Sequence, residues 1–151
     1  MDKGPELRRR WIITSELGQE KRLVRDIEQA LLNEQVPLPR LEEMKTAIAE
    51  ACLNAIEHGN RLNKALNVTV AMLVQASGLT FQVCDQGEGF DIGSVKGGLS
   101  VRDKIDWEQP RGWGLPFMRQ FADRVTASKT AGMFCVELQF GRTEQEGVEQ
   151  G

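Results

Sequence analysis

The sequence predicts an α/β two-layer sandwich, in which helices pack on one face of a mostly antiparallel mixed sheet. Three observations predict this fold class. Two segments in the first half repeat apolar residues with helical spacing, later segments alternate apolar and polar residues as strands do, and short turns join those strands in pairs. The chain has 151 residues, a length that suits one domain with one core.

In the first half, residues 9–15 form a short strand and residues 19–35 a helix. A second helix is expected to begin at residue 39 or 40, because proline fits the first turn, and to run to residue 57 or 58. Gly59 and Asn60 then terminate it.

In the second half, residues 66–75 and 79–85 alternate as two strands joined by a short turn, which makes an antiparallel hairpin. Residues 86–111 show no periodicity and are rich in glycine and charge. A connection this long in a small domain is usually a lid or a binding loop. The last expected elements are a helix over 114–122 and a hairpin of strands over 124–129 and 133–140.

This organisation predicts one domain over residues 9–140. Residues 1–8 are an N-terminal extension, and residues 141–151 are a polar tail that we expect to be disordered. We find no internal repeat and no second domain.

Composition narrows the class of protein. Hydrophobic residues make up 40% and charged residues 27%, with a formal net charge of -3, as in an ordinary globular protein. This charge argues against direct nucleic-acid binding. The run Arg8-Arg9-Arg10 is either a solvated strand edge or a contact with a partner or membrane. Without a transmembrane-length apolar stretch or a signal-peptide core, we expect a cytoplasmic protein that does not contact the membrane.

The three cysteines, Cys52, Cys84 and Cys135, are odd in number and far apart in the sequence. Each lies in an apolar segment, and their spacing does not match a metal site. We therefore expect three buried free thiols.

The second helix carries the first candidate site. At 100° per residue, Glu50, Asn54, Glu57 and His58 share one stripe beside an apolar stripe that faces the sheet. The Asn54 amide oxygen could bind Mg²⁺, and Glu50 could act as general base toward a hydroxyl that attacks a phosphate. The alternative is an ordinary solvated helix face.

The strand that ends at Asp85 runs into a D-x-G-x-G segment. An Asp held at a strand end can accept a hydrogen bond from the exocyclic amine of adenine, and Gly87 and Gly89 would allow the backbone to approach a flat ring. The alternative is a simple turn. A Ca²⁺ loop is disfavoured because too few acidic residues follow at the required spacing.

A second glycine pair, Gly112 and Gly114, lies in the segment from Arg111 to Leu115 at the start of the helix expected over 114–122. Glycines before a helix leave backbone N–H groups free to receive phosphate oxygens. The segment is neither a Walker A loop, which ends in Gly-Lys-Ser/Thr, nor a Rossmann fingerprint, which follows a strand directly.

In their order and spacing, these motifs resemble those of the GHKL (Bergerat-fold) ATPase superfamily. Residues 50–59 resemble its N box, residues 85–89 its first glycine box and residues 112–114 its second. The form Asn54-Ala55-Ile56-Glu57-His58-Gly59 resembles the bacterial anti-sigma-factor serine/threonine kinases of sporulation and general-stress partner switching. The resemblance covers about residues 9–140.

The resemblance implies a Mg-ATP-dependent kinase that phosphorylates a STAS-domain antagonist, binds a sigma factor and often forms a homodimer. It implies Glu50 as the general base, Asn54 as the Mg²⁺ ligand and Asp85 as the adenine contact. The glycine boxes would lie beside the ring and the phosphates, together with Leu115. Arg111 is a candidate γ-phosphate ligand. His58 has either a phosphate-side role or a capping and packing role.

Two other functions stay open in the sequence. One is a non-catalytic module that uses ATP to shape a partner surface, although the presence of both Glu50 and Asn54 favours the kinase. The other is the same kinase chemistry with an output that is not a sigma factor.

Overall fold

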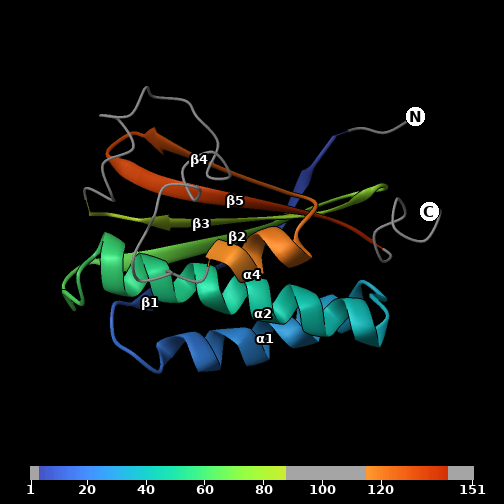
Figure 1. Ribbon diagram of the computed structural model, residues 1–151, viewed down its shortest axis with the longest axis horizontal. Coiled ribbons are helices and arrows are strands. Elements are labelled where there is room, and N and C mark those ends of the chain that lie inside the picture. Colours follow the sequence, from blue (N-terminus) through green and yellow to red (C-terminus); the bar gives the residue numbers. More distant parts are fainter. Residues whose placement is uncertain (1–3, 88–114, 143–151) are drawn as a thin grey trace.

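The computed structural model describes residues 4–87 and 115–142, which form a five-stranded sheet with helices packed on one face (Figure 1). The strand order is β1-β2-β3-β5-β4, and all four neighbouring pairs are antiparallel. The strands are β1 (Glu6–Thr14), β2 (Asn67–Gln75), β3 (Gly78–Asp85), β4 (Arg124–Thr130) and β5 (Met133–Gly141). The predicted two-layer sandwich is confirmed.

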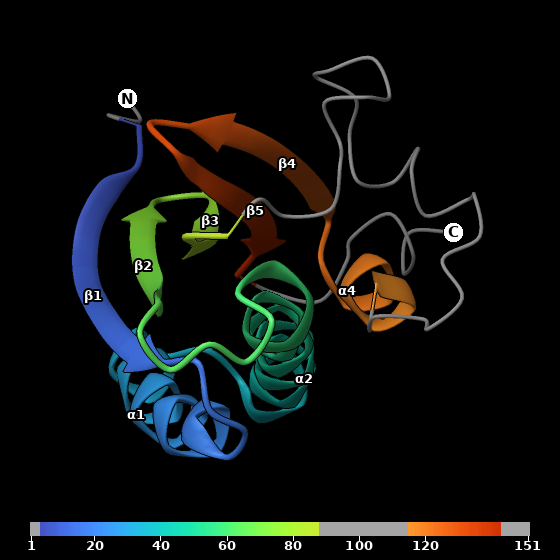
Figure 2. The same ribbon diagram turned by 90° about the vertical axis from the view of Figure 1, so that its left-hand side faces the viewer.

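The helical layer consists of α1 (Gln19–Asn33), α2 (Leu38–Asn54), a π-helical turn η1 (Ala55–Gly59) and α4 (Leu115–Phe121). Figures 1 and 2 show α1 and α2 side by side under the sheet, with α4 next to α2. The chain enters α2 through an extended Pro37, and Pro39 occupies the first turn, where its missing N–H costs nothing. Among the described residues, no helix is long and apolar enough to cross a membrane.

Most element boundaries agree with the sequence within one or two residues. One larger difference is at the N-terminus, where β1 begins at Glu6, which pairs with Val74 of β2. Residues 6–8, which the sequence placed before the first strand, therefore belong to the sheet. Gly78 also lies within β3 and not in the turn, because it pairs with both Gln75 and Gly141.

The core lies between the sheet and the helices α1 and α2. The predicted apolar stripe of α2 is buried throughout: Leu41, Met44, Ile48, Ala51, Cys52 and Ala55. The facing side of β2 is buried as well: Val68, Val70, Met72 and Val74. Alternation along the strands therefore assigned the sheet face correctly, since successive side chains point to opposite faces.

Arg8, Arg9 and Arg10 are exposed on β1, which is an edge strand. Arg8 forms an ion pair with Glu34 at the end of α1, and the Arg9 guanidinium lies 4.9 Å from the centre of the Trp11 ring. The exposure of all three is compatible with a solvated edge and equally with a contact with a partner or membrane, and basic side chains on an edge also discourage pairing with other strands.

The prediction of three free thiols is wrong for two of them. Cys84 of β3 and Cys135 of β5 form a disulfide, whereas Cys52 is buried and free. The two residues are 51 apart in the sequence, but they are directly opposite in the β3–β5 ladder, with Cα atoms 4.0 Å apart. Spacing along the chain gave no indication of this pairing, because only the strand register brings the two side chains together.

Candidate functional site

The candidate site begins where α2 changes its helical form. The sequence predicted a continuous α-helix to residue 57 or 58, but from Ala55 to Gly59 the turn is π-helical, and the Asn60 N–H donates to the Ala55 carbonyl at 2.8 Å. Single π turns inside helices occur frequently at functional sites. Here the wider turn carries Gly59 to the end of β3.

Asn60 holds this turn against the sheet. Its side chain is buried, and Nδ2 donates to Ser15 Oγ at 2.8 Å and to the Asn67 carbonyl at 3.0 Å. Its Oδ1 accepts the Gln86 N–H at 2.9 Å. One buried amide thus connects the segments before α1, after α2, at the start of β2 and after β3, with its polar groups satisfied.

The Asp85 carboxylate lies close to the backbone of two glycines, Gly59 and Gly87. Asp85 is 2% exposed, and its Oδ1 accepts the Gly87 N–H at 3.0 Å. A Cβ added at Gly59 would stand 2.8 Å from Oδ1 of Asp85 and closer still to Oδ2. A Cβ added at Gly87 would overlap the Gly59 carbonyl. Both positions therefore exclude a side chain for a steric reason. The backbone at residues 59 and 87 can come this close to Asp85 only because both residues are glycine.

Burial raises the pKa of Asp85 to about 6, while the hydrogen bond from Gly87 and the positive charge of Lys129 act in the opposite direction. At neutral pH the group is thus mainly an ionised, poorly hydrated carboxylate. Such a group is a strong acceptor for a neutral N–H donor.

Glu50 is partly buried on α2. Burial raises its pKa, and the negative charge of Glu57 raises it further, so the two carboxylates are electrostatic neighbours, as a shared stripe requires. His58 is also partly buried, and its Nε2 lies 3.9 Å from Oε1 of Glu57. The polar stripe therefore lies at the rim of the core, as the sequence indicated.

Asn54 is the last residue of α2 and is 9% exposed. Its side-chain amide is not among the fully buried polar groups that lack a partner in the described part of the chain. Its oxygen is chemically of the neutral kind that Mg²⁺ accepts.

These residues fit an adenine nucleotide with a magnesium ion. The ionised Asp85 matches the exocyclic amine of adenine, and the two glycines leave backbone beside it without side chains. Asn54 would supply a neutral oxygen of the kind that Mg²⁺ accepts together with phosphates and water. Among the described residues, no cluster of three or more His, Cys, Asp or Glu side chains could hold a metal by itself.

Part of the predicted site lies outside the described residues: Gly89, Arg111, Gly112 and Gly114. Leu115 is the first residue of α4, which packs beside α2. The structure brings together Asp85, Gly87 and Gly59 at the end of η1. The role of the other residues in binding phosphate stays a prediction.

Sequence reasoning missed the role of Asn60, which it interpreted only as part of a helix stop. It also missed Ser15, which donates to the Leu66 carbonyl at 2.8 Å while accepting from Asn60. The available signal was that Asn60 is polar and directly follows Gly59, which ends the helix. Its partners could not be predicted, because they come from three other segments of the chain.

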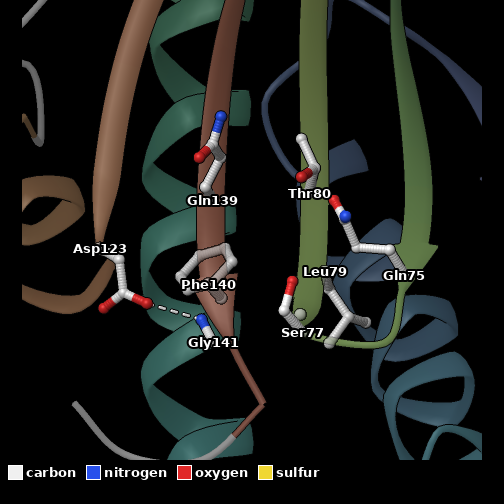
Figure 3. Close-up of a pocket in the computed structure, with 9 residues that line it drawn as sticks. Gln75, Ser77, Leu79, Thr80, Asp123, Gln139, Phe140 and Gly141 are labelled. Atoms are coloured by element: carbon white, nitrogen blue, oxygen red, sulfur yellow. Dashed lines mark hydrogen bonds between the residues drawn. The ribbon is translucent and has the colours of Figure 1, made fainter. Parts of the chain in front are cut away.

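A separate hollow of about 180 Å³ lies at the opposite end of β3 from Asp85 (Figure 3). Its polar lining residues include Gln75, Ser77, Thr80 and Gln139, and Asp123, which also lines it, accepts the Gly141 N–H at Oδ2, at 2.6 Å. None of the predicted site residues contributes to it.

The two-layer fold and the buried acid against a helix-end glycine define an ATPase domain of the Bergerat type. The chain belongs to the family described as the histidine kinase-like ATPase domain, whose model matches residues 13–140.

Within that family, the chain falls in the branch of partner-switching serine kinases. It is 32% identical over 114 residues to the serine-protein kinase RsbW of Bacillus licheniformis, covering 74% of this chain and 70% of the relative. It is 27% identical over 109 residues to RsbW of Staphylococcus epidermidis, covering 70% and 69%.

A solved structure of similar fold is the SiaB–SiaC complex from Pseudomonas aeruginosa. The TM-score is 0.67 at 15% sequence identity, with 89% of this chain and 90% of that chain covered. At this identity the likeness shows the fold alone.

Proposed function

We propose that the protein is a Mg-ATP-dependent serine/threonine protein kinase that phosphorylates a STAS-domain antagonist. The observation that carries this proposal is that the Asp85 carboxylate, at the end of β3, contacts Gly59 and accepts a hydrogen bond from Gly87. Gly59 ends the helical turn that follows α2, and α2 bears Glu50 and Asn54. The similarity to RsbW, which is named a serine-protein kinase, supports the class of reaction.

Asp85 would accept the hydrogen bond of the adenine amine and fix the base, with Gly87 and Gly89 beside the ring. Asn54 would bind Mg²⁺. ATP supplies the phosphoryl group when bound. Glu50 would orient the acceptor hydroxyl and remove its proton, and burial, together with the negative charge of Glu57, raises the pKa of this carboxyl and so makes it a stronger base than an exposed glutamate.

The phosphates would be held by backbone N–H groups of the second glycine box and the start of α4: Gly112, Gly114 and Leu115. Arg111 would contact the γ-phosphate. His58 is either a phosphate-side residue or a packing residue, and its position beside Glu57 is compatible with both.

We further propose that the kinase silences a sigma factor by binding it, acts as a homodimer and works in the cytoplasm without contacting nucleic acid or membrane. The support for this part is the resemblance of its motifs to those of anti-sigma-factor kinases and the similarity to RsbW. A partner switch whose output is another protein would use the same site.

The test is a radiolabel transfer assay with a STAS-domain protein encoded beside this chain. Glu50→Gln keeps the size and hydrogen-bonding capacity of the side chain but removes the base, so phosphorylation should fall at least tenfold, since a general base contributes roughly 10²–10⁴-fold. Binding of ATP and of the STAS protein should persist.

Transfer by Glu50→Gln at the wild-type rate would exclude Glu50 as the base. If the wild type transfers nothing to any Ser or Thr acceptor but binds a partner only with ATP, the non-catalytic module is the better account. Co-purification with a sigma factor separates the anti-sigma output from other outputs.

A further inference from the structure

The disulfide occupies a particular place in the sheet. Cys84 and Cys135 face each other on the side of the sheet away from α1 and α2, because their neighbours Val83 and Val136 point into the core. Both cysteines are partly exposed, in contrast to the fully buried Cys52. Small molecules in solution can therefore reach this pair.

The bridged pair lies between two hydrogen-bonded pairs of the ladder, Val83 with Val136 and Asp85 with Phe134. Cα atoms 4.0 Å apart indicate a non-hydrogen-bonded pair of an antiparallel ladder, since hydrogen-bonded pairs are separated by about 5.5 Å. The covalent bond between the two sulfur atoms thus joins β3 and β5 where no direct backbone hydrogen bond does.

The bridge is also one residue from the adenine-contacting acid. Cys84 directly precedes Asp85, and Cys135 directly follows Phe134, which is opposite Asp85 in the ladder. Beyond Asp85 the chain leaves the sheet at once, and Gln86 and Gly87 are held by Asn60 and by Asp85 itself. A restraint at Cys84 and Cys135 therefore acts on the last sheet residues before the nucleotide loop.

We propose that Cys84 and Cys135 form a reversible dithiol–disulfide site whose oxidation by a low-molecular-weight disulfide, such as glutathione disulfide, tightens nucleotide binding at Asp85. One thiolate attacks a sulfur of glutathione disulfide, forming a mixed disulfide and releasing one glutathione. The thiolate of the second cysteine attacks the sulfur of the first cysteine in the mixed disulfide and releases the other glutathione, so the protein loses two electrons and glutathione disulfide gains them.

Reversibility follows from exposure and compartment. In the cytoplasm, the compartment proposed above, disulfides are usually transient and redox-sensing. The coupling to nucleotide rests on the proposed function, because it requires Asp85 to contact adenine. The disulfide orders the end of β3 before the nucleotide binds. The entropic cost of ordering this segment on binding is therefore smaller.

The experiment equilibrates the full chain in glutathione buffers of graded oxidation state. Alkylation in denaturant followed by mass spectrometry counts the free thiols, including the buried Cys52. Amide hydrogen exchange follows Gln86 and Gly87, and calorimetry measures ADP affinity with Mg²⁺. We expect three free thiols when reduced and one when oxidised. Reduction should speed exchange of both amides at least threefold and weaken ADP binding threefold to tenfold.

Two variants control for other effects. Cys84→Ser combined with Cys135→Ser should behave as the reduced wild type at every glutathione ratio. Cys52→Ala keeps the pair and should respond as the wild type does. By linkage, saturating ADP should shift the half-oxidation point of the wild type toward the disulfide by the same factor as the change in affinity.

The proposal is overturned if all three thiols alkylate at every ratio, if the bridge forms only between chains, or if exchange rates are identical in the two states. A bridge that alters exchange at Gln86 and Gly87 in a protein that binds ADP in neither state would instead contradict the proposed function. Equal ADP affinity in both states with altered exchange would overturn the coupling.

Discussion

Gly59 lies directly against the carboxylate of Asp85, so that the last residue of the π turn and the last residue of β3 share one contact surface. These residues are 26 positions apart in the sequence. Their contact joins the N box to the first glycine box and requires that residue 59 have no side chain.

Gly59→Ala should weaken ADP binding more than tenfold, because the new Cβ displaces the Asp85 carboxylate. The clash should also lower the free energy of unfolding by about 1–3 kcal/mol, as overpacking does. Calorimetric titration with ADP and denaturant unfolding measure the two effects. Gly18→Ala is the control: its φ of 102° strains the backbone, but no neighbour is within 4 Å, so it should lose stability and keep ADP affinity. Equal ADP loss in both variants would contradict this explanation.

ADP affinity should depend on the ionisation of Asp85. Its pKa is raised to about 6, so the carboxylate is charged above this pH and protonated below it. As pH falls from 7.5 to 5, the acceptor loses its charge, and affinity should decrease by about fivefold, the difference between a charged and a neutral hydrogen bond. The Asp85→Asn variant is the control, because residue 85 cannot titrate in it. Any pH dependence that remains in this variant comes from other groups, such as the ADP phosphates. The two profiles, measured side by side, should therefore diverge; parallel profiles would exclude Asp85 as the titrating contact.

Asn54→Ala should remove the dependence of nucleotide affinity on Mg²⁺. The side chain is 9% exposed, and its amide oxygen is the Mg²⁺ ligand proposed above. ADP titrations with Mg²⁺ and with EDTA measure the difference: the wild type should bind more tightly with the metal, and the variant should bind equally in both. A variant that keeps the full Mg²⁺ effect would show that the ion is bound elsewhere.

Asn60→Ala should lower the free energy of unfolding by about 2–3 kcal/mol, because it leaves several buried polar groups without their partner. Asn63→Ala is the matched control: this exposed side chain accepts only the Ala65 N–H at 2.9 Å, so a loss of about 0.5 kcal/mol is expected. Chemical denaturation of both variants checks this difference. A loss at Asn60 no larger than that at Asn63 would mean that the network stabilises the fold little.

The sequence predicted the fold and most of the strand faces because both depend on local periodicity. Val68, Val70, Met72 and Val74 alternate, and the buried stripe of α2 recurs with helical spacing, so each pattern can be recognised without knowing what packs on it. The motif order around Glu50, Asn54 and Asp85 predicted the family for the same reason, since each motif lies within one short segment.

The contacts between distant segments depended on the tertiary structure alone. Strand register placed Cys84 opposite Cys135, the π turn brought Gly59 to Asp85, and Asn60 acquired partners from three other segments. A local pattern sets which face of an element is apolar, but hydrogen bonds, disulfides and steric exclusions at a glycine depend on where the other element lies. The sequence by itself therefore determined the elements and the class of protein, and the packing of η1 against the end of β3 decided the geometry of the site.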